Sequence, residues 1–149
     1  MTSMLERVTQ AWTKAWGEGE TEAFERLVSS DYTRQSKTGS EDLAHVVRQI
    51  EESHLAFSDF HVTVLRAIED DNLVAIHWET VGKHTGEFMG VPPTGRAVTV
   101  RGASFISHRD GLITSEDVVW DPREMLSSMS IWHLGDQRSQ RRKAGNLAD

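Results

Sequence analysis

Cysteine, long apolar runs and positive charge are missing or scarce in this sequence, and each shortage excludes a class of function. The 149 residues contain no cysteine, which excludes disulfides, thiol nucleophiles and cysteine metal sites. No segment approaches the roughly 20 consecutive apolar residues of a membrane span, and the first residues lack the basic and apolar regions of a secretion signal. With 16 basic against 23 acidic residues, the net charge of -7 disfavours nucleic acid and anionic lipid as partners. We therefore expect a soluble, cytoplasmic protein.

One domain is the expected organisation, because 149 residues is close to the commonest domain size. Apolar residues recur at helical spacing in the first part of the sequence. This pattern predicts helices over residues 4–16, 20–28 and 40–54, the last with Ser40 as its N-cap. The polar residues 33–39, between the second and third helix, are predicted to form a loop.

The period of the pattern changes after residue 59 from about 3.6 residues to 2, which predicts strands. The expected strands cover residues 60–68, 73–81, 97–108 and 112–121. A short helix or an edge segment is expected over 123–132. Helices followed by antiparallel strands indicate an α+β domain over residues 1–134, in which a curved sheet wraps the N-terminal helices and leaves an internal pocket. Residues 135–149 have too few apolar side chains to fold, and we expect a flexible tail.

The last predicted strand carries two aspartates on one face. Strict alternation places Asp117 and Asp121 about 13 Å apart, beside Ile113 and Val119. If this face points into the pocket, burial raises the carboxyl pKa toward the range in which the group exchanges a proton at neutral pH, as a general base does. If it points outward, both carboxylates are solvated and Asp121 only ends the strand. Periodicity leaves these alternatives open.

Aromatic and histidine side chains supply candidate ligand-binding residues. Trp16 and Trp78 can stack on a flat ligand or form part of the core. His54 shares a helix face with Val47 and Ile50, which makes it either a hydrogen-bonded core histidine or a polar group in the pocket. The seven histidines show neither His-x-x-x-His nor His-x-His spacing, so we expect no metal site.

A longer motif is typical of a known family. Residues 84–96, HTGEFMGVPPTGR, are followed by an alternating strand, by DGLI at 110–113 and by Asp121, and residues 57–78 form a matching strand pair. This pattern resembles the SnoaL-like polyketide cyclases of the nuclear transport factor 2-like superfamily over about residues 5–131. The resemblance implies a cone-shaped, cystatin-like α+β barrel with a curved antiparallel or mixed sheet, one pocket, no cofactor, and a homodimer or homotetramer.

The resemblance also implies a reaction. In the cyclases, an aspartate at the end of the last long strand removes a proton from the carbon between two carbonyls of an aromatic polyketide ester. The enolate then closes a ring by aldol attack. Asp121 matches this aspartate, and we expect it to act as general acid/base, with Asp117 on the same face as the second catalytic candidate. The residues expected to bind the hydrophobic aromatic substrate are Trp16, Tyr32, His54, Trp78 and Phe105.

Two alternative functions remain open. Val119 stands where cyclases can carry a histidine, so a polar helper for Asp121 would have to be His54, Tyr32 or Asp117. The same pocket can instead hydroxylate or isomerise an aromatic natural-product intermediate, or bind a hydrophobic metabolite without converting it. New oxygen or a moved double bond in the product would identify the first alternative, and an unchanged ligand the second.

Overall fold

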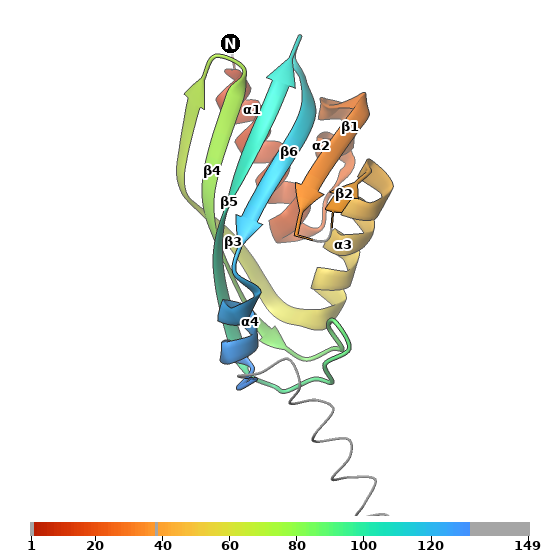
Figure 1. Ribbon diagram of the computed structural model, residues 1–149, viewed down its shortest axis with the longest axis vertical. Coiled ribbons are helices and arrows are strands. Elements are labelled where there is room, and N and C mark those ends of the chain that lie inside the picture. Colours follow the sequence, from red (N-terminus) through yellow and green to blue (C-terminus); the bar gives the residue numbers. More distant parts are fainter. Residues whose placement is uncertain (1, 38, 132–149) are drawn as a thin grey trace, which may run out of the picture.

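The computed structural model describes residues 2–37 and 39–131, which form helical segments and one sheet (Figure 1). The helical segments are α1 (Met4–Thr13), the π-helical turn η1 (Lys14–Glu18), α2 (Glu22–Leu27), α3 (Leu43–Ala56) and α4 (Pro122–Ser128). The strands are β1 (Val28–Ser36), β2 (Gly39–Glu41), β3 (Phe57–Asp70), β4 (Leu73–His84), β5 (Ala97–Arg109) and β6 (Leu112–Trp120). None of these helices is long and apolar enough to cross a bilayer. The expected tail, residues 135–149, lies outside the described residues.

The strands form one mixed sheet in the order β2-β1-β6-β5-β4-β3. Strands β1 and β6 run parallel, and the other neighbouring pairs are antiparallel. The sheet is curved and open, with β2 and β3 at its edges, and the N-terminal helices lie on one side of it (Figure 1). The predicted α+β class, with a curved mixed sheet and N-terminal helices, is therefore confirmed, although the sheet does not close into a barrel.

Strand β1 occupies most of the segment predicted to be a loop over residues 33–39. Its inward side chains are Tyr32 and Arg34, both buried. Because one of these inward residues is charged, burial alternates along the strand while hydropathy does not. The loop prediction is therefore wrong, because a charged residue lies on the inner face of the sheet.

Side-chain caps set the starts of three helices. Ser3 caps α1, Asp42 caps α3 and Asp121 caps α4, each by accepting a hydrogen bond from a backbone N–H two or three residues further on. The predicted cap of the third helix, Ser40, lies in β2 instead. The cap of α4 matters for the site, because it engages the carboxylate predicted to be catalytic.

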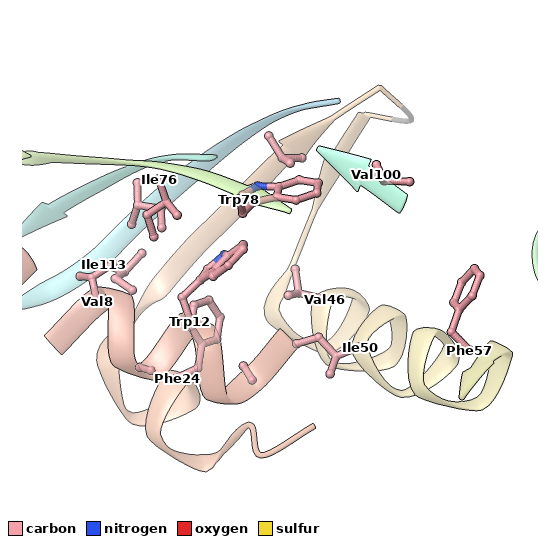
Figure 2. Packing of buried hydrophobic residues seen from close by; sticks show 14 of the residues in the cluster. Val8, Trp12, Phe24, Val46, Ile50, Phe57, Ile76, Trp78, Val100 and Ile113 are labelled. Carbon is pink, nitrogen blue, oxygen red and sulfur yellow. The ribbon is translucent and has the colours of Figure 1, made fainter. Parts of the chain in front are cut away.

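The core fills the space between the helices and the inner face of the sheet (Figure 2). Val8 and Trp12 of α1 pack with Phe24 of α2 beneath Ile76 and Trp78 of β4. The ring centroids of Trp12 and Trp78 lie 6.2 Å apart. The alternation predicted for β4 is confirmed, and it places Trp78 where the core gives way to a cavity.

A β-bulge in β6 reverses the faces that strict alternation predicts. The register of β6 against β5 shifts at Thr114, which is an extra residue in the ladder. Ile113 points inward before the bulge, and Glu116 points inward after it. Asp117 and Asp121 are consequently exposed. Of the two alternatives for their shared face, the outward one therefore holds.

Candidate functional site

A cavity of about 670 Å³ lies between the inner face of the sheet, η1 and α3. Aromatic side chains line much of it, namely Trp12, Trp16, Phe57, Phe60, Trp78, Phe88 and Trp120. Trp12 and Trp78 lie on one side of the space in Figure 2 and Phe57 on the other. Glu52 and Glu87 are among the lining residues that are exposed to solvent. A cavity of this volume accommodates a ligand of several fused rings.

One end of the cavity is charged. Arg34 of β1, Glu41 of β2 and Gln49 of α3 line it, while Glu116 of β6 lies behind this wall and is 1% exposed. Strand pairing brings the charges together, because Arg34 is the register partner of Glu41 in β2 and of Glu116 in β6. Ionisable side chains from three adjacent strands therefore meet at one level of the sheet.

Short contacts join this charged end into one network. Arg34 Nη1 donates to Gln49 Oε1 at 2.9 Å, and the Gln49 amide donates to Glu41 Oε2 at 2.6 Å. Arg34 also lies 3.6 Å from a carboxylate oxygen of Glu41 and 3.6 Å from one of Glu116. Its guanidinium covers the Trp16 ring, 4.9 Å from the centroid. The charge of Arg34 is thus divided between two buried carboxylates.

Two hydroxyl groups extend the network in opposite directions. Ser36 Oγ, on the cavity side, donates to Glu41 Oε1 at 2.6 Å. Tyr32, on the buried side, donates its hydroxyl hydrogen bond to Glu116 Oε1 at 3.5 Å. Burial, and then the charge of Glu116, raise the pKa of Tyr32 far above its ordinary value, so its side chain remains a neutral donor. Tyr32 therefore supports the cavity wall without lining it.

The residues predicted to bind substrate have different positions. Trp16 and Trp78 line the cavity, and the Trp78 indole N–H donates to Ser104 Oγ at 3.2 Å. His54 lies outside the lining, with Nε2 2.9 Å from the Trp16 carbonyl oxygen. Phe105 is 40% exposed because residues alternate along β5, and its neighbour Ser104 takes the inner face. The assignment of Phe105 to the pocket is therefore corrected.

The two predicted catalytic aspartates also lie outside the lining. Asp117 is exposed because of the β6 bulge. The Asp121 side chain is 55% exposed and accepts a hydrogen bond of 2.9 Å from the Arg123 N–H at the start of α4. Its neighbours Trp120 and Pro122 line the cavity, so the backbone at Asp121 passes along the wall while the carboxylate meets solvent.

Sequence reasoning missed the network at the charged end of the cavity, which consists of Arg34, Glu41, Gln49 and Glu116. Arg34 and Glu41 fall in or beside a polar segment that is typical of a loop. Glu116 follows the alternation opposite to the aspartates, and only the bulge brings its side chain inward in the second half of β6. No pattern within the sequence signals this network, because Glu41 and Glu116 both follow Arg34 and only strand pairing places Arg34 between them.

The motif over residues 84–96 holds part of the cavity wall in place. His84 is fully buried at the end of β4, and its Nδ1 accepts a hydrogen bond of 3.2 Å from the Thr94 N–H. Burial lowers the pKa of His84, which favours the neutral ring that this acceptor role needs. Phe88 and Met89, between these two residues, line the cavity. His84 therefore stabilises the loop through this hydrogen bond.

The charged end of the cavity suits proton transfer. A carboxylate beside a fixed cation, in mostly apolar surroundings, can accept a proton while the cation stabilises developing negative charge on a ligand oxygen. Within residues 2–37 and 39–131, no three His, Asp or Glu side chains gather as a metal site requires. The polar side chains that line the cavity in this part of the chain are carboxylates, an arginine, a lysine, an amide and hydroxyl groups.

Comparison with known proteins gives a family and a fold. A family model for SnoaL-like polyketide cyclases matches residues 6–128. No curated protein matches the chain. AclR from Streptomyces galilaeus, a proposed hydroxylase, is 26% identical with a TM-score of 0.75, covering 86% of this chain and 98% of AclR.

Two further solved structures share the fold at lower identity. IdmH from Streptomyces antibioticus, a proposed polyketide cyclase, is 24% identical with a TM-score of 0.71, over 83% of this chain and 96% of IdmH. A Catenulispora acidiphila protein with a ketosteroid isomerase-like fold, solved with trimethylamine, is 19% identical with a TM-score of 0.69, over 83% and 92%. These matches agree with the curved sheet and N-terminal helices described above.

Proposed function

Because the chain belongs to the SnoaL-like polyketide cyclase family, we propose that it catalyses cofactor-independent, aldol-type ring closure of an aromatic polyketide ester. The proposal assigns the general base to Glu41 in place of Asp121. One observation carries this assignment: Glu41 is 8% exposed and lines the cavity, whereas the Asp121 carboxylate is solvated and caps a helix. A base must reach the proton that it removes, and Glu41 satisfies this geometric requirement.

The proposed reaction needs one base and one stabilising charge. Glu41 removes a proton from the carbon between two carbonyls, and the electrons of the broken C–H bond form an enolate. The enolate carbon attacks a second carbonyl of the same molecule, which forms the ring bond and an alkoxide. The alkoxide takes the proton back from the Glu41 carboxyl, so the product is an isomer of the substrate. Arg34 stabilises the negative oxygen in both steps.

The aromatic walls supply the positioning. Trp16 and Trp78 present ring faces or edges to the cavity, on which a fused-ring substrate can stack. Folding a flexible ester chain against such a surface holds the two reacting carbons near contact, which replaces an entropic cost that would otherwise slow the reaction. Among residues 2–37 and 39–131, the lining carries the cations Arg34 and Lys37 together with three glutamates, which favours a neutral ester over a free carboxylate.

The test compares two conservative variants that each remove one basic carboxylate. Glu41→Gln should lower kcat for ring closure by about 10²–10⁴, the contribution typical of a positioned base. Asp121→Asn should keep most of the activity, because its carboxylate lies outside the cavity lining. Product mass distinguishes the reaction, since an aldol isomer has the mass of the substrate. If Asp121→Asn lost its activity while Glu41→Gln remained active, the general base would be Asp121 and not Glu41.

Hydroxylation is the second candidate, and the similarity to AclR favours it. In this case the same base forms the carbanion, which adds to O₂ in place of an internal carbonyl and, with one proton, gives a hydroperoxide. A two-electron reductant such as a thiol in solution then cleaves the O–O bond, which leaves one oxygen atom on the carbon as a hydroxyl group and releases the other as water. Incubation under ¹⁸O₂ separates the candidates: a product heavier by one labelled oxygen atom supports hydroxylation, and an unlabelled isomer supports ring closure. A wild-type protein that binds the ester, as a rise in melting temperature would show, but returns it unchanged would contradict both.

A further inference from the structure

We propose that Glu116 is a positioning residue that draws Arg34 away from Glu41 and so keeps Glu41 basic enough to remove a carbon-bound proton. This inference rests on the proposed function, because it takes Glu41 as the base. The geometry points to Glu116 because this residue does not line the cavity and yet contacts the cation that does. Its effect on a substrate must therefore pass through Arg34.

Strand pairing places Arg34 between its two carboxylates. It is the Cα partner of Glu41 on one side and of Glu116 on the other, and each carboxylate lies 3.6 Å from a guanidinium nitrogen. The contacts use different nitrogens, Nη1 toward Glu41 and Nε toward Glu116. Both contacts are longer than a charge-assisted hydrogen bond, which is about 2.7–2.9 Å. Arg34 is thus held at an intermediate position.

The charges of Arg34, Glu41 and Glu116 explain why the position of Arg34 matters. One guanidinium and two carboxylates leave a formal excess of one negative charge in a group of residues that are each less than a tenth exposed. A cation shared between two carboxylates stabilises the anionic form of each less than it would stabilise one alone. The full charge of Arg34 on Glu41 would make Glu41 a weaker base, and Glu116 prevents this by competing for Arg34.

Other side chains keep this competition fixed. Tyr32, held neutral by its burial, donates to Glu116 at 3.5 Å, and the Trp16 ring supports the guanidinium face at 4.9 Å. Gln49 bridges Arg34 and Glu41 through its amide. In the part of the chain that the structure describes, the other charged residues lining the cavity are Lys37 after β1, Glu52 on α3 and Glu87 in the loop after β4, all of them exposed. Their charges are therefore more strongly screened by water.

The experiment replaces Glu116 with its neutral isostere and observes Glu41 directly. Protein labelled with ¹³C at the glutamate carboxyl carbons is titrated by NMR, and the Glu41 signal is identified from its loss in Glu41→Gln. In Glu116→Gln, Arg34 shifts its charge to Glu41, and we expect the midpoint of the Glu41 titration to move to lower pH. The matched control is Glu79→Gln, which breaks an exposed pair with Arg101 outside the cavity and should leave the midpoint unchanged.

Kinetics give a second readout. A weaker base slows proton removal, so Glu116→Gln should lower kcat by about threefold, with KM unchanged and the acid limb of the pH profile moved to lower pH. Should Glu116→Gln not fold, Glu116→Asp retains the charge at a greater distance from Arg34 and should produce a smaller shift in the same direction. An unmoved Glu41 midpoint in a folded Glu116 variant overturns the inference, whatever its stability.

The NMR result also separates this inference from the proposed function. If the midpoint falls as expected but the wild-type protein forms no ring, the positioning of Arg34 is supported and the proposed reaction is not. If ring closure depends on Glu41 but the midpoint is unmoved, the proposed function holds and Glu116 has only a structural role. Both readouts use the full chain.

Discussion

Replacing Gly102 with alanine should destabilise the protein and disturb the cavity wall at the same time. Gly102 lies in β5 opposite Trp78 of β4 on one side and Trp120 of β6 on the other. A Cβ atom added there would lie 2.6 Å from Trp78 Cη2 and 2.8 Å from the Val119 carbonyl oxygen. Real Cβ atoms do not approach other atoms so closely, so the tryptophan or the strand must move.

The loss of stability in Gly102→Ala depends on how far the neighbouring side chains can move. Overpacking of a well-packed site costs about 1–3 kcal/mol, and Trp78 is held by its hydrogen bond to Ser104. For a chain of this length we expect the melting temperature to fall by about 3–9 °C. Differential scanning calorimetry measures this fall, and tryptophan fluorescence reports the displaced indole. The melting temperature should decrease before any ligand is added.

Gly17→Ala is the matched control. A Cβ at Gly17 would meet its nearest atom, Val62 Cβ, at an ordinary 3.5 Å, and the residue lies in the helical turn η1. Alanine is more favourable than glycine in a helix by up to about 1 kcal/mol, so this variant should be as stable as wild type or more stable. A Gly102→Ala protein with unchanged melting temperature and fluorescence would refute the packing argument.

Two further predictions concern stability. Because burial lowers the pKa of His84, the unfolded chain binds a proton below about pH 6.5 that the folded chain does not, so the free energy of unfolding should fall as the pH decreases from 7.5 to 5.5. Urea titrations at both pH values should show a smaller fall in His84→Gln, and an equal fall would contradict this role for burial. Asp121→Ala removes the α4 cap and should cost about 0.5–2 kcal/mol in the same assay, whereas no loss would exclude a capping role.

The sequence predicted well those elements whose burial follows hydropathy. The strands corresponding to β4 and β5 were predicted within a few residues, because apolar side chains such as Val74 and Ile76 alternate with exposed ones. The first and third helices were predicted from apolar spacing in the same way. Periodicity already indicated the α+β class, and the family motif added the expectation of a nuclear transport factor 2-like fold.

The charged end of the cavity could not be predicted for a physical reason. Its location depends on pairing between strands that are distant in sequence, since Arg34 meets Glu116 only through the parallel pairing of β1 and β6. Its orientation depends on a single extra residue, Thr114, that reverses the alternation of β6. Periodicity within one segment contains neither fact, so a carboxylate one position away was assigned to the pocket.

The most direct test of the account is deuterium exchange at the activated carbon of an aromatic polyketide ester in D₂O. This exchange measures proton removal alone, without the ring closure that follows. We predict that Asp121→Asn exchanges deuterium at nearly the wild-type rate, while Glu41→Gln exchanges it about 10²–10⁴ times more slowly. The reverse order, with fast exchange in Glu41→Gln and slow exchange in Asp121→Asn, would contradict the assignment of the base to the charged end of the cavity.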